Sequence, residues 1–211
     1  MGQAVFCVAT DNSRAYYLIA SRLRRARLNF RSVVPGEAAD FGDCAVILTT
    51  RREAERFAEK SDGSAIAIED LDENPLIMKA QLVARMDEGA RELLLGIDPG
   101  SRIGLAVFYA GAGLGSHTFN SRMSLYKTMF GLVQRVPNSG CIVKIGNGSR
   151  ELATKLASDI RQALPGVTIE IVNEAGTSTR SVRFRSLPRD QSAAARIAFR
   201  KGAPYRGAAP D

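Results

Sequence analysis

The chain has 211 residues, of which 45% are hydrophobic and 24% charged, and its formal net charge is +7. This composition excludes a disordered chain, and no apolar run has the length of a membrane span or a secretory signal. We therefore expect a folded cytoplasmic protein without a membrane partner. The three cysteines are far apart and form no CxxC pair. We interpret them as buried apolar residues and expect neither a zinc site nor a disulfide framework.

The positive charge belongs to the second half of the chain. Residues 1–90 contain 12 Lys and Arg residues against 14 Asp and Glu, whereas residues 91–211 contain 17 against 8. Such a basic region attracts polyanions, of which nucleic-acid phosphates are the commonest, although a solvated face or a loose tail is an alternative interpretation. A single acid, Asp190, interrupts the late basic residues, which are Arg180, Arg183, Arg185, Arg189, Arg196, Arg200, Lys201 and Arg206.

Residues 1–90 predict a small α/β domain, and their sequence does not indicate its role. Four apolar strands alternate with three helices, at residues 5–9, 13–27, 30–34, 45–49, 51–59, 65–68 and 75–86. This alternation predicts three layers, with a mostly parallel sheet between helices. Polar residues follow two of the strands, at 10–13 and 49–50. They either line a crevice at the carboxyl edge of the sheet or cap the following helices, and capping is the commoner use.

Residues 91–202 have a different order of elements. Three hairpin-linked strands precede alternating helices and strands, at residues 93–98, 103–109, 116–120, 124–135, 141–145, 150–163, 167–172 and from about 190. We expect Pro99-Gly100-Ser101 and the glycine-rich segment 111–115 to be the turns of the antiparallel part. The order predicts a mixed five-stranded sheet with flanking helices, which is the ribonuclease H-like arrangement. Residues 203–211 are expected to form a flexible tail.

Three carboxylates fall at element ends that this topology brings together. Asp98 closes the first strand, Glu174 follows the fifth, and Asp190 opens the last helix. The first and fifth strands are separated only by the fourth, and the last helix carries a stripe of small residues that lets it lie close to the sheet (Ala193, Ala194, Ile197, Ala198). Clustered carboxylates raise one another's pKa values unless a cation neutralises them, and oxygen ligands suit Mg²⁺ or Mn²⁺.

Asp98, Glu174 and Asp190 are therefore our candidate catalytic residues and metal ligands. Two bound ions can activate a water and stabilise the leaving oxygen of a phosphodiester. Each acid also has an ordinary explanation, as a turn former before Pro-Gly, an exposed residue past a strand, or a partner of the helix dipole. Those explanations would have to place three unrelated acids at converging element ends, so we favour a shared site.

Two segments are candidates for nucleic-acid binding. In the first, arginines of an extended loop track a phosphate backbone while Phe184 stacks on a base, unless Val182 and Phe184 simply anchor the loop. In the second, backbone N–H groups of residues 146–149 hold a phosphate before a helix, unless Ser149 is only an N-cap. The residues that we expect to bind nucleic acid are Asn147, Ser149, Arg180, Arg183, Phe184, Arg185 and Arg189.

Four stretches of the second half resemble motifs of one superfamily. GIDPGSRIGLAVF resembles the first motif of the RuvC and YqgF families of ribonuclease H-like proteins, and IVNEAGTS and DQSAAARIA resemble their later motifs. IVKIGNGSRELATKL is especially similar to the YqgF-type domain of the Tex family of transcription accessory proteins. The resemblance covers residues 92 to about 200, and the first 90 residues show none.

The resemblance implies a role for each acid. Asp98 matches the first-strand aspartate that holds both metals in active RuvC-like nucleases, Glu174 the fifth-strand acid, and Asp190 the aspartate that opens the last helix. RuvC resolvases have two further acids, near the fourth strand and one turn into the last helix, where this chain has Lys144, Gly146, Asn147 and Ala193. YqgF-like proteins also lack these two acids. Tex-type domains, which are thought to have lost nuclease activity, lack in addition an acid at the position of Asp190.

We expect a metal-dependent, structure-selective nuclease, a hydrolase that acts on DNA junctions like a Holliday-junction resolvase or on structured RNA. Its cofactor would be Mg²⁺ or Mn²⁺, and a two-fold resolvase would be a homodimer. The alternative is a Tex-like, non-catalytic module that binds nucleic acid in transcription or RNA metabolism. An ATPase of the actin and sugar-kinase class also has Asp-x-Gly-Ser after a buried strand, but residues 1–90 contain no second phosphate loop of the kind it needs.

Overall fold

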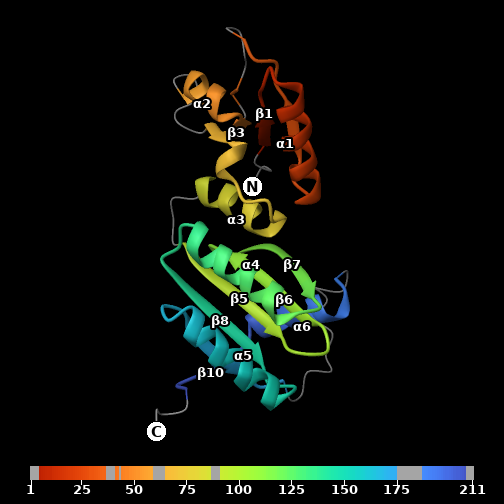
Figure 1. The fold of residues 1–211 in the computed structure, drawn as a ribbon. Coiled ribbons are helices and arrows are strands. Elements are labelled where there is room, and N and C mark those ends of the chain that lie inside the picture. Colours follow the sequence, from red (N-terminus) through yellow and green to blue (C-terminus); the bar gives the residue numbers. More distant parts are fainter. Residues whose placement is uncertain are drawn as a thin grey trace. The chain divides into compact units, whose positions relative to one another are not determined.

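The chain divides into two compact units, Met1–Glu88 and Gly89–Asp211, close to the boundary that the sequence predicts. The computed structural model, drawn as a ribbon in Figure 1, describes residues 5–36, 41–42, 44–58, 65–86, 91–174 and 187–207. No helix in this described part of the chain is long and apolar enough to cross a membrane.

The first unit is built on a four-stranded parallel sheet in the order β2-β1-β3-β4. Its elements are β1 (Val5–Val8), α1 (Ser13–Arg25), β2 (Phe30–Ser32), β3 (Cys44–Thr49), α2 (Arg51–Ala58), β4 (Ala65–Ala67), the 3₁₀ turn η1 (Ile68–Asp70) and α3 (Pro75–Met86). Every strand and helix expected in this half is present, with small differences at the ends. The parallel sheet follows from the continuous apolar strands and the helices between them.

Side chains of this sheet alternate between two covered faces. Phe6 packs in a core with Ile19 of α1 and Met78 of α3. Cys7 packs on the opposite face, with Phe57 of α2. Because successive strand residues point to opposite faces, helices cover both sides of the sheet. The unit therefore has the three layers that the sequence predicts.

Cys7 and Cys44 form a disulfide between the neighbouring strands β1 and β3, with their Cα atoms 5.7 Å apart. Our interpretation of these cysteines as unbridged apolar residues is therefore wrong. Helix α1 and strand β2 lie between them in sequence, and only the parallel pairing of β1 with β3 brings them together. Cys141 is buried with a free thiol. Because disulfides are commoner outside a reducing cytosol, the cytoplasmic location stays a prediction.

The second unit contains a six-stranded mixed sheet in the order β10-β9-β8-β5-β6-β7. Strands β5 (Glu92–Asp98), β6 (Ile103–Tyr109) and β7 (Ala112–Phe119) are antiparallel, and β8 (Gly140–Gly146) and β9 (Thr168–Val172) run parallel to β5. Only β8 separates β5 from β9, as the sequence predicts. The carboxyl ends of three parallel strands therefore lie at one edge of the sheet.

Two details of this sheet differ from the prediction. A sixth strand, β10 (Gly202–Pro204), pairs antiparallel with β9, so the segment that we expected to be a flexible tail begins inside a strand. The turn between β6 and β7 is also shorter than the glycine-rich segment 111–115. It consists of Ala110 and Gly111, whose φ angles of 49° and 77° suit a two-residue hairpin turn, and the remaining glycines lie within β7.

Helices cover both faces of the second sheet. In Figure 1, α4 (Arg122–Arg135) and α5 (Arg150–Ala163) lie on one face and α6 (Arg189–Ala198) on the other. Small residues let α6 pack closely, because a Cβ on Gly96 of β5 would lie only 2.1 Å from the backbone oxygen of Ala194. The close approach predicted from the small-residue stripe of this helix is therefore observed.

Candidate active site

Three elements that are distant in sequence each place a carboxylate at the carboxyl edge of the second sheet. Asp98 is the last residue of β5. Its side chain is on the face that α6 covers, because it lies two residues after Gly96, which faces α6. Asp190 lies in the first turn of α6, and a Cβ on Gly104 of β6 would be 2.2 Å from its backbone oxygen. Glu174 follows the end of β9.

The three carboxylates are close enough to influence one another. Burial raises the pKa of Asp98, and the negative charges of Glu174 and Asp190 raise it further, to about 6, against an opposing effect of Arg196 and Arg189. No described residue donates a hydrogen bond to the Asp98 carboxylate. A carboxylate whose ionised form is disfavoured in this way is stabilised by any cation that binds beside it.

Asp190 carries a buried oxygen that accepts no hydrogen bond from a described residue. This atom, Oδ2, has only an ion-pair neighbour, Nη2 of Arg102, at 3.0 Å. The Arg102 side chain is 64% exposed and that of Asp190 20%, so the arginine lies on the solvent side of the carboxylate. Sequence reasoning missed Arg102, because the pair joins the β5–β6 turn to the start of α6 and no local pattern indicates it.

Glu174 is held by the turn between β8 and α5. Its Oε1 accepts a hydrogen bond from the Gly148 N–H at 2.9 Å, and its own N–H donates to Oδ1 of Asn147 at 3.0 Å. A Cβ on Gly146 would lie 2.1 Å from the same Oε1. Gly146 therefore makes room for the carboxylate, and Gly148 donates to it.

The residues expected to bind nucleic acid fall into two groups. Ser149 caps α5, which is the alternative that the sequence leaves open, while Asn147 accepts the backbone hydrogen bond described above. Arg189 begins α6 and lies near enough to Asp98 to lower its pKa. Phosphate binding by these three residues stays a prediction. The others lie outside the described residues, namely Arg180, Arg183, Phe184 and Arg185.

The carboxylates suit a hard cation in their chemistry. Mg²⁺ and Mn²⁺ prefer carboxylate oxygens, and the buried Oδ2 of Asp190 is left without a hydrogen bond. Within the described part of the chain, no three His, Cys, Asp or Glu side chains are grouped as a metal site. Arg102 and the Gly148 N–H each engage one carboxylate, so cation binding would displace or share these contacts.

A further buried carboxylate lies at the carboxyl edge of the first sheet. Glu53 of α2 accepts hydrogen bonds from the hydroxyls of Thr10 and Thr50, both at 2.6 Å, and from the Asp11 N–H at 2.8 Å. Burial alone would raise the pKa of Glu53, but the hydrogen bonds outweigh it and lower the pKa to about 2. Asn12 caps α1. Helix capping is thus observed at Asn12, and a crevice is also present, since Asp11, Asn12, Thr50 and Glu53 line a pocket of about 550 Å³.

Comparison with known proteins does not assign the chain to a family. The chain matches no protein-family model and shows no significant similarity to a curated protein. The resemblance to RuvC- and YqgF-like domains therefore stays a prediction that rests on short motifs. Function has to be inferred from the carboxylates and their surroundings.

Proposed function

We propose that the second unit has the ribonuclease H-like arrangement of RuvC- and YqgF-type domains and that the protein is a metal-dependent, structure-selective nuclease. The observation that carries this proposal is the half-buried Asp98 at the end of β5, whose pKa is raised to about 6 by burial and by the charges of Glu174 and Asp190. A half-buried carboxylate whose pKa is raised beside other acids is unfavourable for the fold alone and is typical of active sites. The basic second half of the chain suits a polyanionic substrate, either a DNA junction or structured RNA.

Each residue at the edge has a distinct part in this proposal. Asp98, Glu174 and Asp190 would hold Mg²⁺ or Mn²⁺, which when bound lower the pKa of an attacking water and stabilise the leaving oxygen. Close packing of α6 on the sheet keeps Asp190 in place over Gly104. Arg189 lies near enough to Asp98 to act on it electrostatically, and its charge would also attract the phosphodiester.

Three contacts favour the alternative, a non-catalytic nucleic-acid-binding module. Arg102 already supplies a cation to Asp190, and the Gly148 N–H already donates to Glu174. In addition, Lys144 of β8 pairs with Glu170 at 3.4 Å and stands near the place where RuvC resolvases have an acid. A domain that has lost its metals would retain its fold through contacts of this kind.

Cleavage of a defined set of substrates tests the proposal. The protein is incubated with Mg²⁺ or Mn²⁺ and a labelled four-way DNA junction, a DNA flap, single-stranded DNA and structured RNA. We expect Asp98→Asn to reduce metal-dependent cleavage by roughly a hundredfold or more while the fold is retained. Asp70→Asn is the matched control, because Asp70 is exposed in the first unit and, among the described residues, pairs with Arg51.

The outcomes separate the two functions. Cleavage that is lost in Asp98→Asn and kept in Asp70→Asn supports the nuclease. Cleavage that survives in both variants contradicts it, since the activity would then arise elsewhere. Tight, salt-sensitive binding without cleavage favours the binding module. Light scattering of the junction complex shows whether the protein binds as the homodimer that a two-fold resolvase requires.

A further inference from the structure

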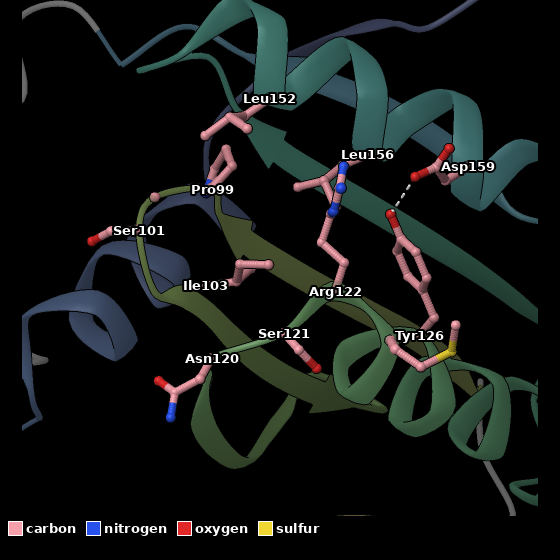
Figure 2. A pocket seen from close by; sticks show the side chains of 12 residues that line it. Pro99, Ser101, Ile103, Asn120, Ser121, Arg122, Tyr126, Leu152, Leu156 and Asp159 are labelled. Atoms are coloured by element: carbon pink, nitrogen blue, oxygen red, sulfur yellow. Dashed lines mark hydrogen bonds between the residues drawn. The ribbon is translucent and has the colours of Figure 1, made fainter.

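The second unit has a pocket on the face of its sheet opposite α6. It encloses about 650 Å³ between the β5–β6 turn, the start of α4 and the middle of α5, as Figure 2 shows. Ile103 at the start of β6 lines it and belongs to the face covered by α4 and α5, since strand residues alternate. Its volume is in the range of pockets that hold small molecules or single groups of larger ligands.

The walls of this pocket are suited to a flat, partly polar ring. Leu152 of α5 and Met123 of α4 line it and remain 37% and 63% exposed, so the pocket presents apolar surface to solvent. The ring of Tyr126 provides an aromatic wall, and its hydroxyl donates to Oδ2 of Asp159 at 2.7 Å. The pocket therefore combines apolar surface, an aromatic face and a fixed carboxylate.

Polar donors are present at the same place. Arg122 reaches from the start of α4 toward α5 in Figure 2, and among the described residues its guanidinium makes no hydrogen bond or ion pair. Its N–H groups can therefore bind a phosphate or the edge of a base. Burial and the hydrogen bond to Asp159 raise the pKa of Tyr126, so its hydroxyl stays a donor at neutral pH.

The pocket adjoins the carboxylates across the edge of the sheet. Its lining includes Pro99, Gly100 and Ser101, the turn that directly follows Asp98. Asp98 itself is on the α6 face, whereas the pocket is on the other face, so only this turn separates them. A nucleic-acid strand that crosses the turn would place a phosphate beside the carboxylates and a neighbouring base at the pocket.

We propose that this pocket binds a nucleobase of the substrate strand, stacked against Tyr126 and held at its edge by Asp159 and Arg122. The placement beside the cleaved phosphate rests on the proposed nuclease function, whereas base binding itself does not. A purely apolar ligand would leave the Arg122 guanidinium without a partner and would make no hydrogen bond with Asp159. A nucleobase offers both an aromatic face and hydrogen-bonding groups at its edge, and stacking tolerates every base.

Methyl NMR of the full chain tests base binding without any cleavage. Adenosine 5′-monophosphate is titrated into methyl-labelled protein, with ribose 5-phosphate as the probe that lacks a base. We expect adenosine 5′-monophosphate, and not ribose 5-phosphate, to shift the methyl resonances of Ile103, Leu152 and Leu156. Equal shifts with both probes would show a phosphate site, and no shift at all would show an unused pocket; either result overturns the proposal.

A pair of variants tests whether the same pocket binds a base of a single-stranded oligonucleotide. Single-stranded oligonucleotides that contain one abasic position at successive sites are bound in EDTA, so that no cleavage occurs. We expect one abasic position to weaken binding by roughly tenfold, and Leu152→Trp, which fills the pocket, to remove this difference. Thr154→Trp is the matched control, because Thr154 is an exposed residue of α5 that does not line the pocket.

These outcomes are distinct from those of the nuclease experiment. Base binding that is lost in Leu152→Trp and kept in Thr154→Trp supports the pocket even if no substrate is cleaved, in which case only the nuclease proposal fails. If the nuclease is confirmed but the abasic positions have the same effect in both variants, the pocket is overturned and the nuclease stands.

Discussion

Glu53 and Asp98 occupy comparable places in the two units, at the carboxyl edge of a sheet with parallel strands, yet their pKa values move in opposite directions. Both carboxylates are partly or largely removed from water, which by itself raises the pKa of an acid. Three threonine hydroxyls and the Asp11 N–H donate to Glu53, and its pKa falls to about 2. Asp98 has two acids nearby instead, and its pKa rises to about 6.

The difference separates a structural carboxylate from a functional one. The donors around Glu53 lie at or just after the ends of β1 and β3, and Glu53 itself is on α2, so the ionised group connects three elements. The surroundings of Asp98 disfavour its charge and contribute nothing of this kind. A carboxylate in surroundings like those of Asp98 is typical of a site where a bound ligand stabilises the ionised form. Four predictions test whether this distinction holds, beginning with the largest effect.

Glu53→Gln should destabilise the first unit by about 2–3 kcal/mol, because charge-assisted hydrogen bonds are lost and buried donors are left poorly paired. Hydrogen exchange of the amides in β1 and β3 measures this effect within the full chain. Glu55→Gln is the matched control, since Glu55 is exposed on the same helix. An equal effect of both variants would mean that the hydrogen bonds around Glu53 contribute little.

The pH dependence of stability should reveal the ionisation of Glu53. The pKa of Glu53 is lower in the folded protein, at about 2, than its ordinary value of 4.5. Its contribution is therefore fully present above about pH 4.5 and is lost as the pH falls toward 2. The difference in unfolding free energy between the wild type and Glu53→Gln should shrink over this interval. A difference that stays constant with pH would contradict the lowered pKa.

The sequence predicts the elements around Asp98 well because their signals are local. An apolar run that ends at an acid and a turn predicts β5, and the small residues from Ala193 to Ala198 predict a helix close to the sheet. Signals for β10, for the Cys7–Cys44 disulfide and for the Arg102–Asp190 pair are absent from the sequence. Each of these joins segments that meet only after the sheets have formed, so no local pattern indicates it.

Asp98→Asn should change the free energy of unfolding in the opposite direction to Glu53→Gln. Removing the charge removes the cost of burying it and the repulsion from Glu174 and Asp190. The metal-free protein should therefore become more stable by roughly 1 kcal/mol, a value reduced by solvent screening. Thermal unfolding in EDTA measures the change, with Asp70→Asn as the control. If Asp98→Asn is instead less stable than the wild type, then the Asp98 carboxylate stabilises the fold, as that of Glu53 does.

Arg102→Gln tests whether the carboxylates around Asp98 are satisfied by contacts within the protein, as Glu53 is. The Arg102 side chain of its ion pair with Asp190 is 64% exposed, so its removal should cost little stability. It should also raise the affinity for Mn²⁺ by roughly two- to fivefold, because a cation that competes for Asp190 is gone. Isothermal titration with Mn²⁺ measures this, and Arg150→Gln, at an exposed position that begins α5, is the control. If Arg102→Gln instead lowers stability strongly and no Mn²⁺ binds, then Arg102 is the permanent cation of these carboxylates. The site around Asp98 would then be satisfied by the protein itself, as Glu53 is, and the non-catalytic binding module would be the better account of the second unit.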